Sequence, residues 1–319
     1  MADNELKSML DRAEDYAGRG DARAATSFYQ AALKQAQAGP VNPQLMPRLQ
    51  RGQLFIREAI ATFQDALERA VQENRPGDEI GAMRVDHALG MLKGERLVYL
   101  QEPSVLYYPY LSQRQYFERE EFDWVAALES ATADIREELK ALVDEGADFR
   151  PYVENDPDRP AGDFAGLNDN LSWSVLYLWR DGRIVEENAR RCPRTMAALE
   201  EVPLSHIGGR TPAVLFSRLE PGAHIPPHNG MLNCRLICHL PLIVPKGCWL
   251  RVGNEKREWE EGKLLMFDDS FEHEAMNPTN DLRIILLFDV WRPELSTGER
   301  SAISAIFDAI DRFQGLPDA

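Results

Sequence analysis

Six histidines are present in the chain, and five of them lie beyond residue 200, where imidazole groups could bind a metal ion or transfer protons. His228 follows the rigid Ile-Pro-Pro run at 225–227, and His273 follows the aspartate-rich turn at 267–270. Imidazole is a good ligand for divalent iron, copper and zinc. A lone histidine is more often a structural or surface residue than a ligand, so these two are judged by their arrangement with other residues.

The segment 234–243 predicts a β-strand with two different faces. Alternation puts only apolar side chains on one face, which must belong to a core: Cys234, Leu236, Cys238, Leu240 and Leu242. The opposite face carries Arg235, Ile237 and His239. Charge in such an apolar strand is costly unless it meets an anion or a partner. We therefore expect Arg235 and His239 to point into a polar site, with a solvent-exposed sheet face as the alternative.

The last predicted strand, 283–291, repeats this pattern. One of its faces carries Arg283, Ile285, Leu287 and Asp289, and the other is wholly apolar. An arginine that begins such a strand suits a buried carboxylate, because its planar guanidinium can bind both oxygens. The alternative is an internal salt bridge from Arg283 to Asp281 or Asp289.

Two histidines far apart in sequence, with an arginine one strand beyond the second, form the arrangement of an iron(II)- and 2-oxoglutarate-dependent oxygenase. Imidazoles hold the metal there, and open coordination positions remain for 2-oxoglutarate and oxygen. A zinc site built on Cys234 and Cys238 is a competing interpretation. Alternation disfavours it, because both sulfurs would lie on the core face, opposite His239.

The elements that position these residues change character along the chain. From residue 173 onward the hydrophobic period is near 2, and turn dipeptides such as those at 181–182 and 246–247 separate short segments. This pattern predicts a jelly roll rather than a parallel sheet. We therefore predict an α+β multidomain chain: a helical region at 1–100, a linker with a packing helix at 101–165, a double-stranded β-helix (jelly-roll, cupin-like) domain at 166–300, and a C-terminal helix at 301–319.

The first hundred residues have helical spacing. Small and aromatic side chains fall at the spacing of a tetratricopeptide unit, namely Ala13, Tyr16, Ala25, Tyr29 and Ala32. Asp21 is a plausible N-cap for the second of two helices. A generic helical hairpin explains the same pattern and remains the alternative.

Composition excludes several classes of protein. The chain has 319 residues and a formal net charge of −16, which argues against a protein that coats nucleic acid or an anionic membrane. No stretch approaches the roughly 20 apolar residues of a membrane-spanning helix. The first ten residues lack the pattern of a signal peptide, so we expect a cytoplasmic location. Four cysteines are too few and too irregular for a disulfide framework.

Several motifs occur in order along roughly residues 165–297: GAHIPPH, NCRLICHL, WEEGK, FDDSFEHE and DVWRPEL. Together with SWSVLYLWRDGR upstream, they resemble the aspartyl/asparaginyl β-hydroxylase family. The resemblance implies a double-stranded β-helix that uses Fe(II), 2-oxoglutarate and oxygen to hydroxylate an unactivated C–H bond. It implies His228 and His273 as the iron ligands, with His224 a weaker candidate. A tetratricopeptide-type region precedes this domain in animal members of the family.

The resemblance also implies the remaining site residues. Ser217 and Arg283 would bind the distal carboxylate of 2-oxoglutarate, and His239 the carboxylate near the metal. Gly230 stands where most related oxygenases carry a carboxylate ligand, so water would complete the iron's coordination shell and Asp269 would contact that water. Arg235 would face the acidic side chain of the substrate.

Two departures make the substrate pocket more apolar. Better-known animal members carry a second basic residue at the position of Ile237 and a glutamine at that of Val175. The resemblance implies an Asp or Asn residue of a peptide or protein as substrate. A free amino acid, a small anionic metabolite or a lipid acyl chain is the alternative, and a non-catalytic cupin-like scaffold with a partner-binding helical region is a second one.

Overall fold

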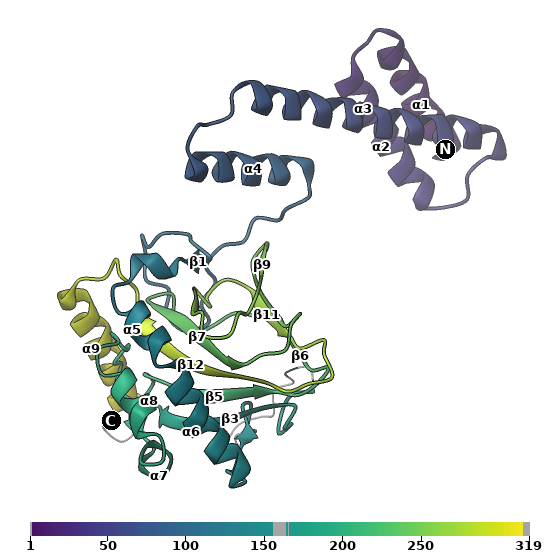
Figure 1. Cartoon of the computed structure of the whole chain (residues 1–319). Helices are drawn as coiled ribbons and strands as arrows, with labels where there is room; N and C mark the ends of the chain where they lie inside the picture. The colour runs from purple at the N-terminus through teal and green to yellow at the C-terminus, as the bar shows by residue number, and fades with distance from the viewer. Residues whose placement is uncertain (1, 156–163, 165, 315–319) are drawn as a thin grey trace. The chain divides into compact units, whose positions relative to one another are not determined.

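The computed structural model describes residues 2–155, 164 and 166–314. The chain divides into two compact units, Met1–Leu97 and Val98–Ala319. The first unit is helical and the second contains all the strands, as Figure 1 shows. No helix in the described part of the chain combines the length and apolar character needed to cross a bilayer.

The first unit is built from antiparallel helices. Its elements are α1 (Ala2–Gly18), α2 (Ala22–Gln37), the short 3-10 helix η1 (Pro43–Leu45), α3 (Met46–Glu73) and α4 (Glu79–Lys93). The predicted N-cap is confirmed, because the Asp21 side chain accepts a hydrogen bond from the Ala24 amide at 3.0 Å. Leu10, Ala13 and Tyr29 are buried where α1, α2 and α3 meet. The predicted helical hairpin is confirmed, and its tetratricopeptide character stays a prediction.

The second unit begins with a loop and a few short elements before its main strands. These are β1 (Tyr116–Phe117), η2 (Arg119–Glu121), α5 (Val125–Ser130), α6 (Thr132–Asp144), β2 (Arg150–Pro151), β3 (Trp173–Arg180), β4 (Arg183–Ile184), α7 (Glu186–Ala189) and α8 (Pro193–Ala198). The turn between β3 and β4 has positive φ at both Asp181 and Gly182, as the predicted Asp-Gly hairpin requires.

The later part of this unit is mostly β-structure. It contains β5 (Val214–Leu219), β6 (His224–His228), β7 (Arg235–Ile243), β8 (Trp249–Val252), β9 (Glu255–Glu258), β10 (Leu265–Phe267), β11 (His273–Met276), β12 (Arg283–Trp291) and the helix α9 (Thr297–Gln314). An eight-stranded sheet has the order β1-β10-β7-β12-β5-β3-β2, with β4 paired to β3, and a four-stranded sheet has the order β6-β11-β8-β9. The predicted fold class, a helical region followed by a double-stranded β-helix domain, is confirmed.

The large sheet separates two hydrophobic cores. Helices α5 and α6 lie across its outer face in Figure 1, where Ile135 and Leu139 join Leu236 and Cys238 in one cluster. Its inner face packs on the small sheet, and Ile237 belongs to that second cluster. The predicted alternation along β7 is therefore correct. It leaves the polar members of the inner face between the two sheets.

The outer core should dominate the stability of this unit. Leu139 is fully buried, so Leu139→Ala should lower the free energy of unfolding by about 3 kcal/mol through lost contacts and a cavity. Urea unfolding followed by tryptophan fluorescence measures this unit alone, because all six tryptophans lie within it. Lys140→Ala on the exposed side of α6 is the matched control. Equal unfolding midpoints for the two variants would contradict this assignment of the core.

Candidate active site

A cavity of about 250 Å³ lies between the two sheets. All seven residues proposed from sequence line it: Ser217, His228, Arg235, His239, Asp269, His273 and Arg283. They come from the inner faces of β5, β7 and β12, from the facing ends of β6 and β11, and from the turn after β10. The roles of these residues remain proposals, but the structure places all seven side chains at the same cavity.

Two histidines face each other across neighbouring strands. Antiparallel pairing of β6 with β11 sets His228 opposite His273, with ring centroids 4.1 Å apart. Nδ1 of His228 lies 2.8 Å from the Pro226 carbonyl, and Nδ1 of His273 lies 3.0 Å from the Phe271 carbonyl. Each carbonyl fixes a proton on Nδ1, which leaves Nε2 of both rings with a free electron pair. Burial lowers the pKa of His228, and it lowers that of His273 to about 3.

This donor set fits a divalent transition metal. Neutral imidazoles with a fixed tautomer are the form that coordinates iron, and a backbone carbonyl on Nδ1 is the usual orienting partner. Within the described residues, no cluster of three or more histidine, cysteine or acidic side chains has metal-binding geometry. The described residues thus offer two imidazoles as candidate ligands at this point of the cavity.

Gly230 and Asp269 occupy the space next to this pair. The Gly230 amide donates to the Asp269 carbonyl at 2.6 Å, and a Cβ at position 230 would overlap the Asp269 carboxylate. Glycine is thus required by the position of Asp269. Burial raises the pKa of Asp269 to about 6, against the lowering effect of Arg235. Its Oδ1 is buried and has no hydrogen-bond partner in the described structure.

Arg283 is a buried cation at the other end of the cavity. Its side chain is 1% exposed, and its Nη1 donates to the Ser217 carbonyl at 3.2 Å and to Ser217 Oγ at 3.3 Å. The guanidinium stacks on Trp259, 4.5 Å from the ring centre. Among the described residues no carboxylate pairs with it, so the alternative of a salt bridge to Asp281 or Asp289 is wrong. Burial lowers its pKa to about 10, which leaves it charged at neutral pH.

His239 lies on the inner face of β7, between these two ends. Its ring is buried beside Phe267 and Trp259, with centroids 5.0 and 5.9 Å away. Burial and the charge of Arg283 hold its pKa well below the usual range, so the ring is neutral. Its Nδ1 has no partner within the described structure, and a neutral imidazole can still donate one hydrogen bond.

Arg235 is mostly buried, with 12% of its side chain exposed, and it already has two anionic partners. Its Nη1 lies 2.8 Å from Asp289 Oδ2, and its Nη2 lies 3.2 Å from Asp269 Oδ2. Burial alone would lower its pKa, but the two carboxylates raise it. The prediction that Arg235 faces an acidic substrate group therefore overlooked these two carboxylates of the same chain.

The weaker candidates lie apart from the site. His224 is exposed and its Nε2 lies 2.7 Å from Glu274. Cys238 is packed in the outer core and Cys234 in a separate cluster, and both are free thiols. This placement disagrees with a shared zinc site.

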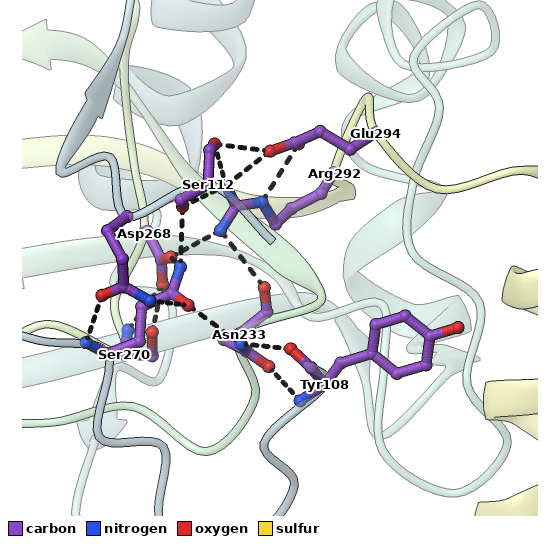
Figure 2. Close-up of polar contacts among 9 residues, drawn as sticks. Tyr108, Ser112, Asn233, Asp268, Ser270, Arg292 and Glu294 are labelled. Atoms are coloured by element: carbon purple, nitrogen blue, oxygen red, sulfur yellow. Dashed lines mark hydrogen bonds and ion pairs between the residues drawn. The ribbon is translucent and has the colours of Figure 1, made fainter. Parts of the chain in front are cut away.

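Sequence reasoning missed a buried ion pair that holds the turn after β10. Arg292 and Asp268 are both fully buried, with 2.7 Å between Nη1 and Oδ2. The Asp268 carboxylate also accepts hydrogen bonds from the Gln101 side chain at 2.6 Å and from the Ser270 amide at 3.0 Å. Figure 2 shows Arg292 reaching this carboxylate between Ser112 and Asn233.

The loop 99–114 completes this network. Asn233 donates to Gln101 at 3.1 Å and accepts from the Tyr108 amide at 2.6 Å, a contact drawn in Figure 2. Arg292 donates to the Ser112 carbonyl at 2.9 Å. The motifs NCR, FDDS and DVWRP contained four members of the network, Asn233, Asp268, Ser270 and Arg292, but no sequence signal identified Gln101 or Ser112 as their partners.

An aromatic wall was also missed. Tyr152 stacks on Trp173 with ring centroids 4.0 Å apart, and both line the cavity with Phe164 and Tyr177. The Trp173 indole nitrogen lies 3.3 Å from Ser217 Oγ. These rings give this wall of the cavity an apolar character.

The fold and cavity define a double-stranded β-helix protein with a two-histidine site. The family model for aspartyl/asparaginyl beta-hydroxylases matches residues 129–293, slightly more than half of the chain. The chain belongs to the aspartyl/asparaginyl beta-hydroxylase family.

Relatives of known name agree with this membership. Human aspartyl/asparaginyl beta-hydroxylase is 40% identical over 184 residues, which cover 57% of this chain and 23% of the human protein. The ornithine lipid ester-linked acyl 2-hydroxylase of Rhizobium tropici is 34% identical over 191 residues, covering 59% of this chain and 64% of that protein. The chain thus matches about a quarter of the human relative. Among solved structures, a Pseudomonas putida prolyl-4-hydroxylase aligns with a TM-score of 0.32 and 13% identity, covering 53% of this chain and 99% of that one.

The buried ion pair should be sensitive to loss of one charge. Asp268→Asn should lower the free energy of unfolding by about 3 kcal/mol, because it leaves the buried Arg292 without its closest counter-ion. Glu294→Gln removes a more exposed partner of the same arginine and should cost less than about 1 kcal/mol. Tryptophan-monitored urea unfolding compares the two. If both variants lost a similar free energy of unfolding, Asp268 would not be the more important partner of Arg292.

Proposed function

We propose that this chain is an Fe(II)- and 2-oxoglutarate-dependent dioxygenase that hydroxylates the β-carbon of an Asp or Asn residue in a peptide or protein. One oxygen atom of O₂ would enter the C–H bond and the other would enter succinate, with release of carbon dioxide. The observation that carries the proposal is Arg283, a buried cation without a carboxylate partner among the described residues, in the same cavity as the histidine pair.

The metal site would consist of His228 and His273. Bound iron would supply the activation of oxygen that no side chain can provide. The two backbone carbonyls orient the rings, and burial keeps both imidazoles neutral at physiological pH. The unpartnered Oδ1 of Asp269 would accept a hydrogen bond from a water ligand.

The cosubstrate would lie between the metal site and Arg283. Arg283 and Ser217 would bind its distal carboxylate, because a buried guanidinium with uncommitted N–H groups is matched by an anion of this shape. His239 would donate to the carboxylate nearer the metal. The aromatic wall of Tyr152 and Trp173 would limit the access of water to the reacting carbon.

A lipid acyl chain is a second candidate substrate for the same chemistry. It is favoured by the 34% identity to an ester-linked acyl 2-hydroxylase and by the half-exposed apolar side chains of Tyr152 and Met231 at the cavity. The peptide substrate remains the first proposal because of the greater identity to the aspartyl/asparaginyl hydroxylases.

His228→Ala and His273→Ala should each abolish binding of Fe(II) or Mn(II) and the production of succinate from 2-oxoglutarate. His224→Ala is the matched control, since it removes an exposed imidazole from the same strand, and it should retain both properties. Calorimetry with Mn(II) and succinate assays with Fe(II) and ascorbate provide the measurements. A non-catalytic scaffold would produce no succinate in any variant, wild type included.

Arg283→Gln should weaken 2-oxoglutarate binding about 100-fold or more, because it removes the buried charge opposite the distal carboxylate. Arg218→Gln, on the neighbouring strand β5 and paired with Glu220, is the control and should bind normally. Titration of the Mn(II)-loaded protein with 2-oxoglutarate measures the affinity. Unchanged affinity in Arg283→Gln would exclude this residue as the carboxylate receptor.

A further inference from the structure

The charges that line the cavity can be counted among the described residues. Two of the lining side chains are guanidinium groups, Arg235 and Arg283, and two are carboxylates, Asp269 and Asp289. The cavity therefore offers as many carboxylates as guanidinium groups before any ligand enters.

The two cations are not equivalent. Arg235 is neutralised by Asp289 at 2.8 Å and by Asp269 at 3.2 Å, so its positive charge is already shared between two carboxylates. Arg283 has no such partner within the described structure, and under the proposed function its charge is taken by 2-oxoglutarate. Bound iron(II) and the cosubstrate would carry opposite charges of equal size, so together they would add no net charge to the cavity.

A substrate carboxylate would add a negative charge to the cavity without adding a cation. It would be the third carboxylate around Arg235, and its charge would be buried without a cation of its own. Among the described residues that line the cavity, Arg283 is the only other arginine or lysine, and Ile237, two positions along the same face of β7, is apolar.

Arg235 can nevertheless bind a neutral oxygen. Its guanidinium has five N–H groups, two of which are committed to Asp269 and Asp289. Its Nε is buried and has no partner in the described part of the chain. A carbonyl oxygen accepts such a donor without adding net charge, and a buried donor left unsatisfied is costly.

We propose that the substrate group bound beside Arg235 is an uncharged carboxamide, so that the site hydroxylates asparagine and discriminates against aspartate. This inference rests on the proposed function and narrows its substrate class. Asp289 is then a specificity-determining residue. It fixes Arg235 through one oxygen and is itself held by the Ala213 amide at 2.8 Å and by Ser205 Oγ at 2.7 Å.

The test compares two matched peptide libraries with randomised flanks, one with a central Asn and one with a central Asp. Immobilised protein loaded with Mn(II) and 2-oxoglutarate, without oxygen and at pH 7.5, selects from an equimolar mixture. Mass spectrometry then gives the ratio of retained Asn to Asp peptides. We expect at least about a tenfold preference for Asn, since a like charge in a closed site costs several kcal/mol.

Asp289→Asn should shift this ratio at least about tenfold toward Asp, because it removes one carboxylate charge from Arg235. Ile237→Arg should shift it in the same direction by adding a cation to the same face of β7. Incubation with Fe(II), ascorbate and oxygen should reproduce the wild-type preference as products heavier by 16 Da. Urea unfolding verifies that each variant is folded.

Equal retention of both libraries by the wild-type protein, a preference for Asp, or retention of neither would overturn the inference. The proposed function is judged separately, by calorimetric binding of 2-oxoglutarate to the Mn(II)-loaded protein. Normal cosubstrate binding with a preference for Asp would reject the carboxamide and leave the oxygenase intact. Absence of cosubstrate binding would reject the oxygenase itself.

Discussion

The arrangement of this domain depends on the cost of burying charge between two β-sheets. An ionised group in that interior must meet a counter-charge within the protein or receive one from a ligand. Arg292 and Arg235 meet carboxylates of the same chain, whereas Arg283, among the residues that the structure describes, meets the oxygens of Ser217 and the face of Trp259 but no carboxylate. That difference separates two arginines that are paired within the fold from Arg283, whose charge would be available to an anion under the proposed function.

Strand geometry explains why these groups share one cavity. Along β7 and β12 every second side chain points inward, so Arg235 and His239 on one strand and Arg283 and Asp289 on the other all face the small sheet. The intervening residues build the outer core under the helices. A shift of one residue in the register of either strand would bury the charges in that core and expose its apolar side chains to the cavity.

The sequence predicted the fold class, the two faces of β7 and the seven residues that meet in the cavity. These features depend on local alternation or on motifs within short stretches. It did not predict that Asp289 pairs with Arg235 instead of Arg283, nor that Gln101 reaches Asp268 across 167 positions. Such pairings are decided by which strands become neighbours and by the path of a loop, and neither leaves a periodic pattern in the sequence.

The net charge of −16 therefore says little about what the site attracts. Solvent and salt screen the acidic surface within about 10 Å, whereas Arg283 in the cavity is almost fully buried. For an anion that enters the cavity, we expect the attraction by the Arg283 guanidinium to exceed the repulsion by the acidic groups on the surface. Within the described residues Arg283 has no carboxylate partner, which costs folding free energy, and the two hydrophobic clusters on either side of the large sheet help the domain to tolerate it. Under the proposed function, an anionic ligand at Arg283 would return part of that stability.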